Sequence, residues 1–212
     1  MKRLVFLSML PCLAIAQHTL TLSGPATARP GDTITITANL GTTTPAVIAA
    51  IQWTNSYIPL TSTAGSVVAA AAKQLSCNNY SSTRQICVIH GLNLNTISSG
   101  PLATYTYQIP LGQAPGSLTF RLVENVVPPV MPLGTIASTA TGASVTVTNT
   151  YYTVNILSKF DLDGDGSTAV SDLNILLDQV LGKAGCAADY NGNGVCDVQD
   201  VILMQRAIQG LP

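Results

Sequence analysis

Two stretches of this chain place oxygen-bearing side chains at the same alternating spacing. Residues 161–172 read DLDGDGSTAVSD, and residues 189–200, offset by 28 positions, read DYNGNGVCDVQD. Both carry Asp or Asn at positions 1, 3, 5 and 12, and glycine at position 6, where a calcium-binding loop turns sharply. A hard cation takes about six to eight oxygen ligands from such a looping backbone, so the repeat predicts two bound Ca²⁺ ions.

The predicted metal ligands follow from these loop positions. Positions 1, 3, 5 and 12 supply side-chain oxygens, position 7 supplies a backbone carbonyl, and position 9 supplies a carboxylate only in the second loop. Position 9 of the first loop is Ala169, where a water must reach the ion. The alternative, a solvated acidic turn, does not explain why the glycines match in both loops. The ligands are Asp161, Asp163, Asp165, Ser167 and Asp172 in the first loop, and Asp189, Asn191, Asn193, Val195, Asp197 and Asp200 in the second.

Four cysteines follow the N-terminal segment as two pairs, each with a separation of ten residues: Cys77 with Cys87, and Cys186 with Cys196. Four cysteines allow three connectivities, and the spacing favours two local disulfides in an oxidising compartment. A zinc site would need closer cysteine spacing or histidine partners, and neither histidine of the chain lies near the second pair.

The N-terminus predicts export. Residues 1–16 combine two basic residues, a short apolar run and an A-x-A site, which is typical of a signal peptide cut before Gln17. No later apolar run reaches the roughly 18 residues of a spanning helix, so we expect no membrane span in the mature chain. The expected location is therefore secreted, extracellular or at the cell surface.

Charge divides the mature chain into two parts. Residues 17–150 hold two acidic and four basic side chains, a net charge of +2, whereas residues 151–212 hold eight aspartates and three basic side chains, a net charge of −5. Neither part has the basic patch that nucleic-acid binding requires.

The first part predicts an antiparallel β-sandwich. Residues 18–24, 32–40, 103–109, 117–123 and 143–149 alternate apolar and polar side chains and are rich in Thr, Val, Ile and Tyr, with Pro and Gly turns between them. Residues 67–75 fit either a helical turn or a strand. Many short strands separated by such turns are typical of β-sandwiches.

The surroundings of the two loops identify a family. An apolar stripe typical of a helix follows each loop, and Gly182 and Gly210 are placed to end these helices. The residues before each loop do not favour a helix. A duplicated unit of calcium loop and exiting helix in an exported chain resembles a dockerin domain, here residues 160–212, joined to the sandwich by a linker over residues 151–159.

The sandwich in turn resembles a cohesin, the partner of dockerins. Residues 28–40 (ARPGDTITITANL), 48–66, 99–123 and 142–147 are similar, in order, to successive cohesin strands. Tyr57 is followed by Ile58 where cohesins have Asp, and the segment between Cys77 and Cys87 has no counterpart. The resemblance implies a mainly β protein, a cohesin-like sandwich of jelly-roll type over residues 17–150 with a small α-helical dockerin. The alternative is an immunoglobulin-type sandwich that acts as a spacer or adhesin.

These resemblances imply a non-catalytic assembly protein. Its partners would be cohesin- or dockerin-bearing proteins, a second copy of this chain included, in a polysaccharide-related complex. Dockerins contact their partners through loop positions 10 and 11 and the exiting helix. The implied contact residues are Val170, Ser171, Leu177 and Asp178 in one repeat, and Val198, Gln199, Gln205 and Arg206 in the other.

A second hypothesis is a carbohydrate-binding or adhesive sandwich that a dockerin tethers elsewhere. An exposed, planar row of aromatic side chains would favour it, and the residues available for such a row are Trp53, Tyr57, Tyr80, Tyr105 and Tyr107.

Catalysis is not expected. Glycoside hydrolysis needs a pair of carboxylic side chains, and the sandwich has only Asp32 and Glu124. We expect His18 to lie in a disordered N-terminal segment and His90 to be a structural residue.

Overall fold

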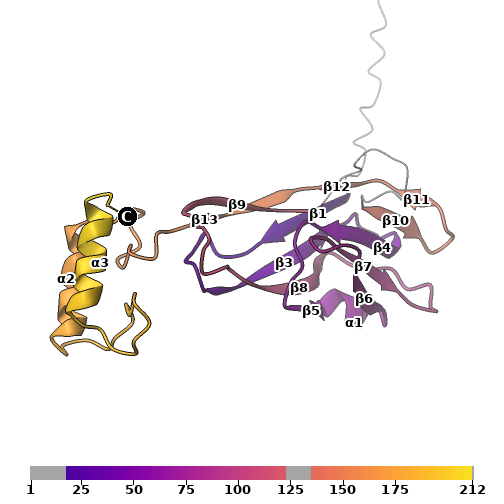
Figure 1. Cartoon of the computed structure of the whole chain (residues 1–212). Helices are drawn as coiled ribbons and strands as arrows, with labels where there is room; N and C mark the ends of the chain where they lie inside the picture. The colour runs from indigo at the N-terminus through magenta and orange to yellow at the C-terminus, as the bar shows by residue number, and fades with distance from the viewer. Residues whose placement is uncertain (1–17, 123–134, 212) are drawn as a thin grey trace, which may run out of the picture.

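The computed structural model describes residues 18–122 and 135–211. The predicted signal peptide and Glu124 lie outside this part of the chain. The described residues form a β-sandwich and, beyond one of its ends, a small module of two helices and two long loops (Figure 1). Within the described part, no helix has the length and apolar composition needed to cross a membrane.

Three sheets make up the sandwich, with strand orders β12-β1-β3-β8-β5, β11-β10-β4-β7-β6 and β2-β13-β9. The elements are β1 (His18–Ser23), β2 (Thr27–Ala28), β3 (Thr33–Gly41), β4 (Ile48–Asn55), β5 (Thr61–Ala64), α1 (Ser66–Ala70), β6 (Gln74–Asn79), β7 (Gln85–His90), β8 (Gly100–Gln108), β9 (Gly116–Arg121), β10 (Ile136–Thr139), β11 (Ser144–Val145), β12 (Val147–Asn149) and β13 (Tyr151–Ile156).

The predicted mainly antiparallel sandwich is confirmed. Four of the segments with an alternating pattern each lie largely within one strand, β1, β3, β8 or β9, and residues 143–149 divide between β11 and β12. Most neighbouring strands pair antiparallel. Two pairs, β1 with β12 and β2 with β13, are parallel. The segment left open, residues 67–75, divides between the short helix α1 and the start of β6.

The core takes residues from all three sheets, and alternate residues of strands such as β1, β3 and β7 are buried in it. Trp53 of β4 donates a 2.7 Å hydrogen bond from Nε1 to the Tyr105 hydroxyl of β8, and both side chains are fully buried. This bond joins the two five-stranded sheets through their interior. Tyr107 is buried as well, so the aromatic residues available for an exposed row do not form one, and only Tyr57 and Tyr80 of that set are exposed.

The segment between Cys77 and Cys87 belongs to a hairpin of β6 and β7. The two cysteines are opposite each other in the register of this pair and form a disulfide. The second predicted bridge, Cys186–Cys196, is also present.

The predicted linker over residues 151–159 is wrong for its first six residues. Tyr151–Ile156 form β13, which pairs antiparallel with β9 over six residues and parallel with β2. Val154 and Ile156 are buried in the core, so this segment belongs to the sandwich by its packing as well as its hydrogen bonds. Only residues 157–160 then separate the last strand from the first loop, which begins at Asp161.

His18 also departs from expectation. It lies in β1, opposite Val147 of β12, and its buried ring hydrogen-bonds to the Thr42 hydroxyl at 3.0 Å. The first described strand is therefore an ordered part of the sheet, because a neighbouring strand and a loop both hold it.

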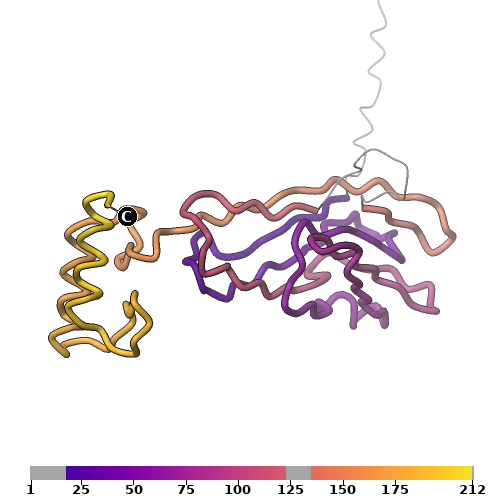
Figure 2. The backbone as a smooth tube through the Cα atoms, viewed as in Figure 1, coloured from indigo at the N-terminus to yellow at the C-terminus, as the bar shows by residue number. Residues whose placement is uncertain are grey.

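The module contains α2 (Val170–Val180) and α3 (Val198–Ile208), which lie side by side (Figures 1 and 2). Leu176, Met204 and Ala188 are fully buried at the centre of its core. Gly182 and Gly210 take positive φ values of 72° and 66° and follow the last residues of the two helices, which confirms their predicted role.

The hydrogen bond between Trp53 and Tyr105 gives a test of the core. In Tyr105→Phe, the buried indole N–H loses this acceptor, and we expect unfolding to become easier by about 1–3 kcal/mol. Urea titration followed by the fluorescence of Trp53, the single tryptophan, reports on the sandwich. Tyr151→Phe, at an exposed site, is the matched control and should leave the midpoint unchanged. Equal midpoints for the two variants would contradict this role of the bond.

Candidate metal centre

The first loop is folded around the side chain of its first residue. The buried carboxylate of Asp161 accepts hydrogen bonds from the backbone amides of Gly164 and Gly166, at 2.7 and 2.9 Å. Asp163 accepts from the amide of Asp165 at 3.1 Å, and Asp165 from that of Ser167 at 2.8 Å. Each acidic side chain thus holds the backbone that follows it, and alternate residues are presented to the same side of the loop.

The second loop repeats this pattern at the equivalent positions. Asp189 accepts from the amides of Gly192 and Gly194, both at 2.7 Å. Asn191 accepts from the amide of Asn193, and Asn193 from that of Val195, both at 2.9 Å. The similarity predicted from the repeat therefore extends from residue types to backbone geometry.

Position 12 closes each loop onto the start of its helix. Asp172 accepts from the amides of Leu162 and Asp163 with one oxygen and from that of Ala169 with the other. Asp200 is bound in the same way by the amides of Tyr190, Asn191 and Asp197.

Both closing carboxylates are fully buried. Burial by itself raises the pKa of Asp172 and Asp200, but these backbone hydrogen bonds outweigh it, and both pKa values lie below the usual range. The two side chains are therefore carboxylates at neutral pH, which is the form that a cation needs.

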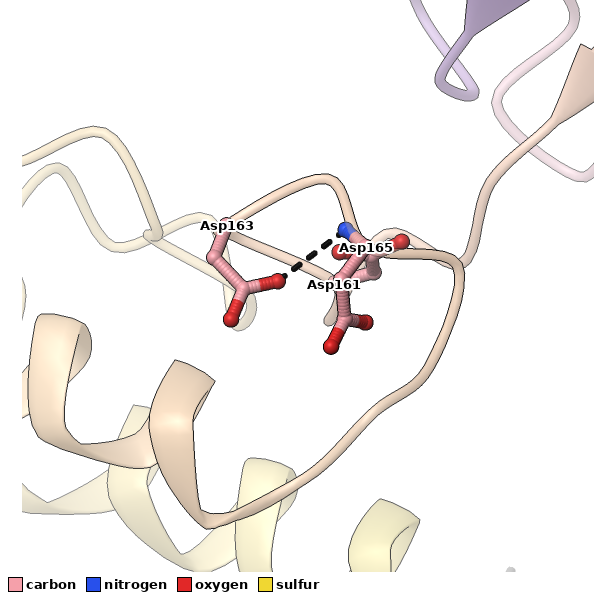
Figure 3. Close-up of side chains that lie close together, drawn as sticks. All are labelled: Asp161, Asp163 and Asp165. Atoms are coloured by element: carbon pink, nitrogen blue, oxygen red, sulfur yellow. Dashed lines mark hydrogen bonds between the residues drawn. The ribbon is translucent and has the colours of Figure 1, made fainter.

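The charges of the first loop converge. One carboxylate oxygen from each of Asp161, Asp163 and Asp165 lies within 4.8 Å of the others (Figure 3). Like charges at this separation repel unless a cation lies among them. The ion pair of Lys183 with Asp178 lies outside both loops. The donor set, all oxygen and rich in carboxylates, fits a hard divalent cation.

The two loops differ at position 9. Asp197 caps α3 by accepting from the amide of Gln199 at 2.7 Å, and Ala169 has no side-chain oxygen for the same role in α2. The second loop also has the disulfide between Cys186 and Cys196, and Gln179 of α2 accepts from the amides of Ala187 and Ala188 on its approach. The disulfide and the Gln179 bonds therefore fix the second repeat at positions outside its predicted ligands.

A contact that the sequence did not indicate joins the first loop to the sandwich. Arg29 donates from Nε and Nη2 to the backbone carbonyl of Asp161, at 2.9 and 2.5 Å. The Arg29 amide is itself held by the Asp32 carboxylate at 2.7 Å, in the Pro-Gly-Asp turn before β3. Nothing in the sequence marks this pairing, because 132 residues separate its two partners.

An aromatic cluster lies beside this contact. The rings of Phe160 and Tyr190 have centroids 4.6 Å apart, and the Lys159 ammonium lies 4.9 Å from the centroid of the Phe160 ring. Burial raises the pKa of the Tyr190 hydroxyl above its usual value. The residue before the first loop and the second residue of the other loop thus pack against each other, which ties the two repeats together.

All eight residues predicted to contact a partner are exposed on the module. The apolar members among them are Val170, Leu177 and Val198. Leu181 of the first repeat and Ile202 of α3 are also exposed, and the sequence analysis missed both. Ile202 lies outside the apolar stripe of α3, and this position in the sequence could have indicated that its side chain is exposed. The two helices therefore present apolar side chains to solvent at positions that their own core does not use.

Comparison with known proteins identifies the fold of the sandwich. A cohesin module from a family 33 glycoside hydrolase of Clostridium perfringens matches 68% of this chain and 98% of its own length, with a TM-score of 0.53 and 9% identity. This likeness shows that the sandwich has a cohesin-like fold. No family model and no curated protein matches the chain.

Two further solved structures are similar with lower TM-scores. A non-cellulosomal cohesin from the hyperthermophilic archaeon Archaeoglobus fulgidus matches 68% of this chain and 94% of its own length, with a TM-score of 0.49 and 15% identity. A type III cohesin module from the cellulosomal ScaE cell-surface anchoring scaffoldin of Ruminococcus flavefaciens matches 67% and 88%, with a TM-score of 0.49 and 13% identity.

The Arg29 contact predicts a stiff joint between sandwich and module. Arg29→Ala removes both donors, and Arg29→Lys keeps the charge but cannot reproduce the planar pair of N–H groups. We expect both variants to let the module reorient. In ¹⁵N relaxation, the two parts of the wild-type chain should share one rotational correlation time, and the module of each variant should show a shorter one. Arg84→Ala is the control, and unchanged correlation times in Arg29→Ala would contradict the role.

Proposed function

We propose that this chain is a secreted, non-catalytic assembly protein in which a calcium-dependent, dockerin-type module docks onto the cohesin-like sandwich of another chain. That other chain is a second copy of this protein or a separate cohesin-bearing protein, in a polysaccharide-related complex. The observation that carries the proposal is the presence, in one chain, of a cohesin-like sandwich and a duplicated loop-and-helix module with the same backbone hydrogen bonds in both repeats.

Two Ca²⁺ ions are proposed because both loops present oxygen atoms in the order that this ion uses. The first ion would be held by the residues at positions 1, 3, 5, 7 and 12 of its loop, and the second by those positions together with Asp197. When bound, calcium neutralises the clustered carboxylates and so favours the folded loops over the unfolded chain.

Docking between chains is favoured by the short connection. Residues 157–160 and the Arg29 contact hold the module beyond the end of the sandwich, so its helices do not lie over the sheets of their own chain (Figure 1). The exposed apolar residues of α2 and α3 therefore remain available to another chain. The opposite net charges of sandwich and module would assist the encounter of two copies, mainly at low salt.

Two observations support a role other than catalysis for the sandwich. The Asp32 carboxylate holds the amide of Arg29 in its turn, and the exposed His90 ring hydrogen-bonds to the Ser76 hydroxyl across the β6–β7 pair. Both groups thus have structural partners. A flat carbohydrate-binding platform is not favoured, because Trp53 and Tyr105 are buried in the core.

Calcium dependence is tested by removing the first residue of both loops. Asp161→Ala with Asp189→Ala deletes the carboxylates around which the loops fold, and we expect the calcium-induced helical signal in far-ultraviolet circular dichroism to disappear. Asp178→Ala, an exposed carboxylate outside the loops, should retain it. Full helical signal of the wild-type chain in chelator would show that the module folds without the ion.

Docking is tested by placing charge on the exposed face of α3. We expect Val198→Asp with Gln205→Glu to abolish calcium-dependent assembly, measured by analytical ultracentrifugation. Calcium affinity should stay intact, because neither side chain is a predicted ligand. Leu92→Asp with Leu94→Glu, at two exposed sites of a sandwich loop, is the charge-matched control. A wild-type chain that stays monomeric at high concentration with calcium would exclude self-assembly and leave a separate cohesin-bearing partner.

A further inference from the structure

A hollow lies at the end of the sandwich where β4 and β8 finish and β9 begins. Its volume is about 320 Å³, at the small end of the range for ligand sites in proteins. It belongs neither to the predicted metal loops nor to the helix face of the proposed docking interaction. The residues that line the hollow therefore have no role in either of the proposed binding functions.

Three aromatic rings form one side of the hollow. The Tyr57 ring meets Phe120 edge to face with centroids 5.3 Å apart, and Phe120 meets Tyr107 at 4.9 Å. Phe120 and Tyr107 are buried, whereas Tyr57 is 39% exposed. The two inner rings thus support an outer ring that still presents surface to solvent.

The remaining wall offers hydrogen-bonding groups without charge. Gln108, Gln113, Ser82 and Thr83 contribute amides and hydroxyls, and among the residues that the structure describes no charged side chain lines the hollow. Tyr107 lies in the same wall and is only 6% exposed.

We propose that this hollow is a binding site for one neutral sugar unit. The apolar C–H face of a sugar ring packs against an aromatic ring, and its hydroxyls match neutral amide and hydroxyl partners. None of the described lining residues offers a cation to a uronic acid or a phosphate. An apolar side chain of a protein would use the rings but leave the amides unpaired, which makes it the poorer occupant.

The wall is held in place by the sandwich backbone. Ile109, which lines the hollow, accepts from the amide of Gly31 at 2.9 Å and donates to the carbonyl of Asp32 at 2.8 Å. These residues belong to the turn that also carries Arg29. A wall that is fixed before binding loses little conformational freedom when a ligand enters.

Titration of the full-length mature chain, with calcium present, tests the proposal. Cellobiose, xylobiose, mannobiose and maltose are the neutral probes, glucuronic acid is the charged one, and the ring signals of labelled tyrosines are followed by NMR. We expect at least one neutral probe to shift the Tyr57 signals with saturation and glucuronic acid to leave them unmoved. Tyr57→Ala should weaken binding at least about tenfold. Gln113→Glu, which places a negative charge at the wall without removing a ring, should also weaken it.

Tyr80→Ala is the matched control, because Tyr80 is exposed to a similar degree and does not line the hollow. It should bind the probe as the wild-type chain does. The proposal is overturned if no neutral probe shifts the Tyr57 signals, or if Tyr57→Ala and Tyr80→Ala bind equally. Saturating binding of the apolar peptide acetyl-Leu-Leu-amide in place of every sugar would also overturn it and would identify a protein-docking pocket. None of these outcomes depends on whether the module docks onto another chain.

Discussion

The position of the module depends on the pairing of one strand. β13 hydrogen-bonds to β9 along its length and to β2 at its end, and this pairing continues until the Leu157 amide bonds to the carbonyl of Ala28. Arg29 directly follows β2 in the sequence. The Arg29 guanidinium therefore lies where the segment after β13 leaves the sheet. Asp161, four residues beyond Leu157, then comes within reach of it. A ladder of backbone bonds thus sets where the first loop begins.

Inside the module, the governing constraint is the use of acidic side chains as acceptors for backbone amides. A carboxylate that binds amides stays ionised, as the lowered pKa values of Asp172 and Asp200 indicate. The same bonds that shape the loop therefore concentrate negative charge within it. An apolar core as small as that around Leu176 and Met204 offers little to offset this repulsion. The loops and their charge together favour a cation as part of the folded module.

Much of this fold could be predicted because its signals are local. Period-two alternation placed five strand segments, loop spacing placed the two repeats, and glycines placed the helix ends. The missed features are those that depend on distant partners. Tyr151–Ile156 were predicted to be part of a linker because the strands that pair with this segment, β2 and β9, begin far earlier in the chain. His18 looked terminal because its partner Thr42 lies in a loop 24 residues away. The Arg29 contact and the hollow beside Tyr57 likewise arise only when separate segments meet.

The two repeats share a backbone but not a surface, and this difference bears on how the module would dock. Leu177 of the first repeat corresponds to Gln205 of the second, and Asp178 to Arg206. The second loop alone has the disulfide and the Asp197 cap. At these positions a partner that binds α2 contacts an apolar side chain and a negative charge. A partner that binds α3 contacts an amide and a positive charge. Rotation of the module by half a turn would exchange unlike groups, so we expect one orientation to be preferred in any complex that the module forms.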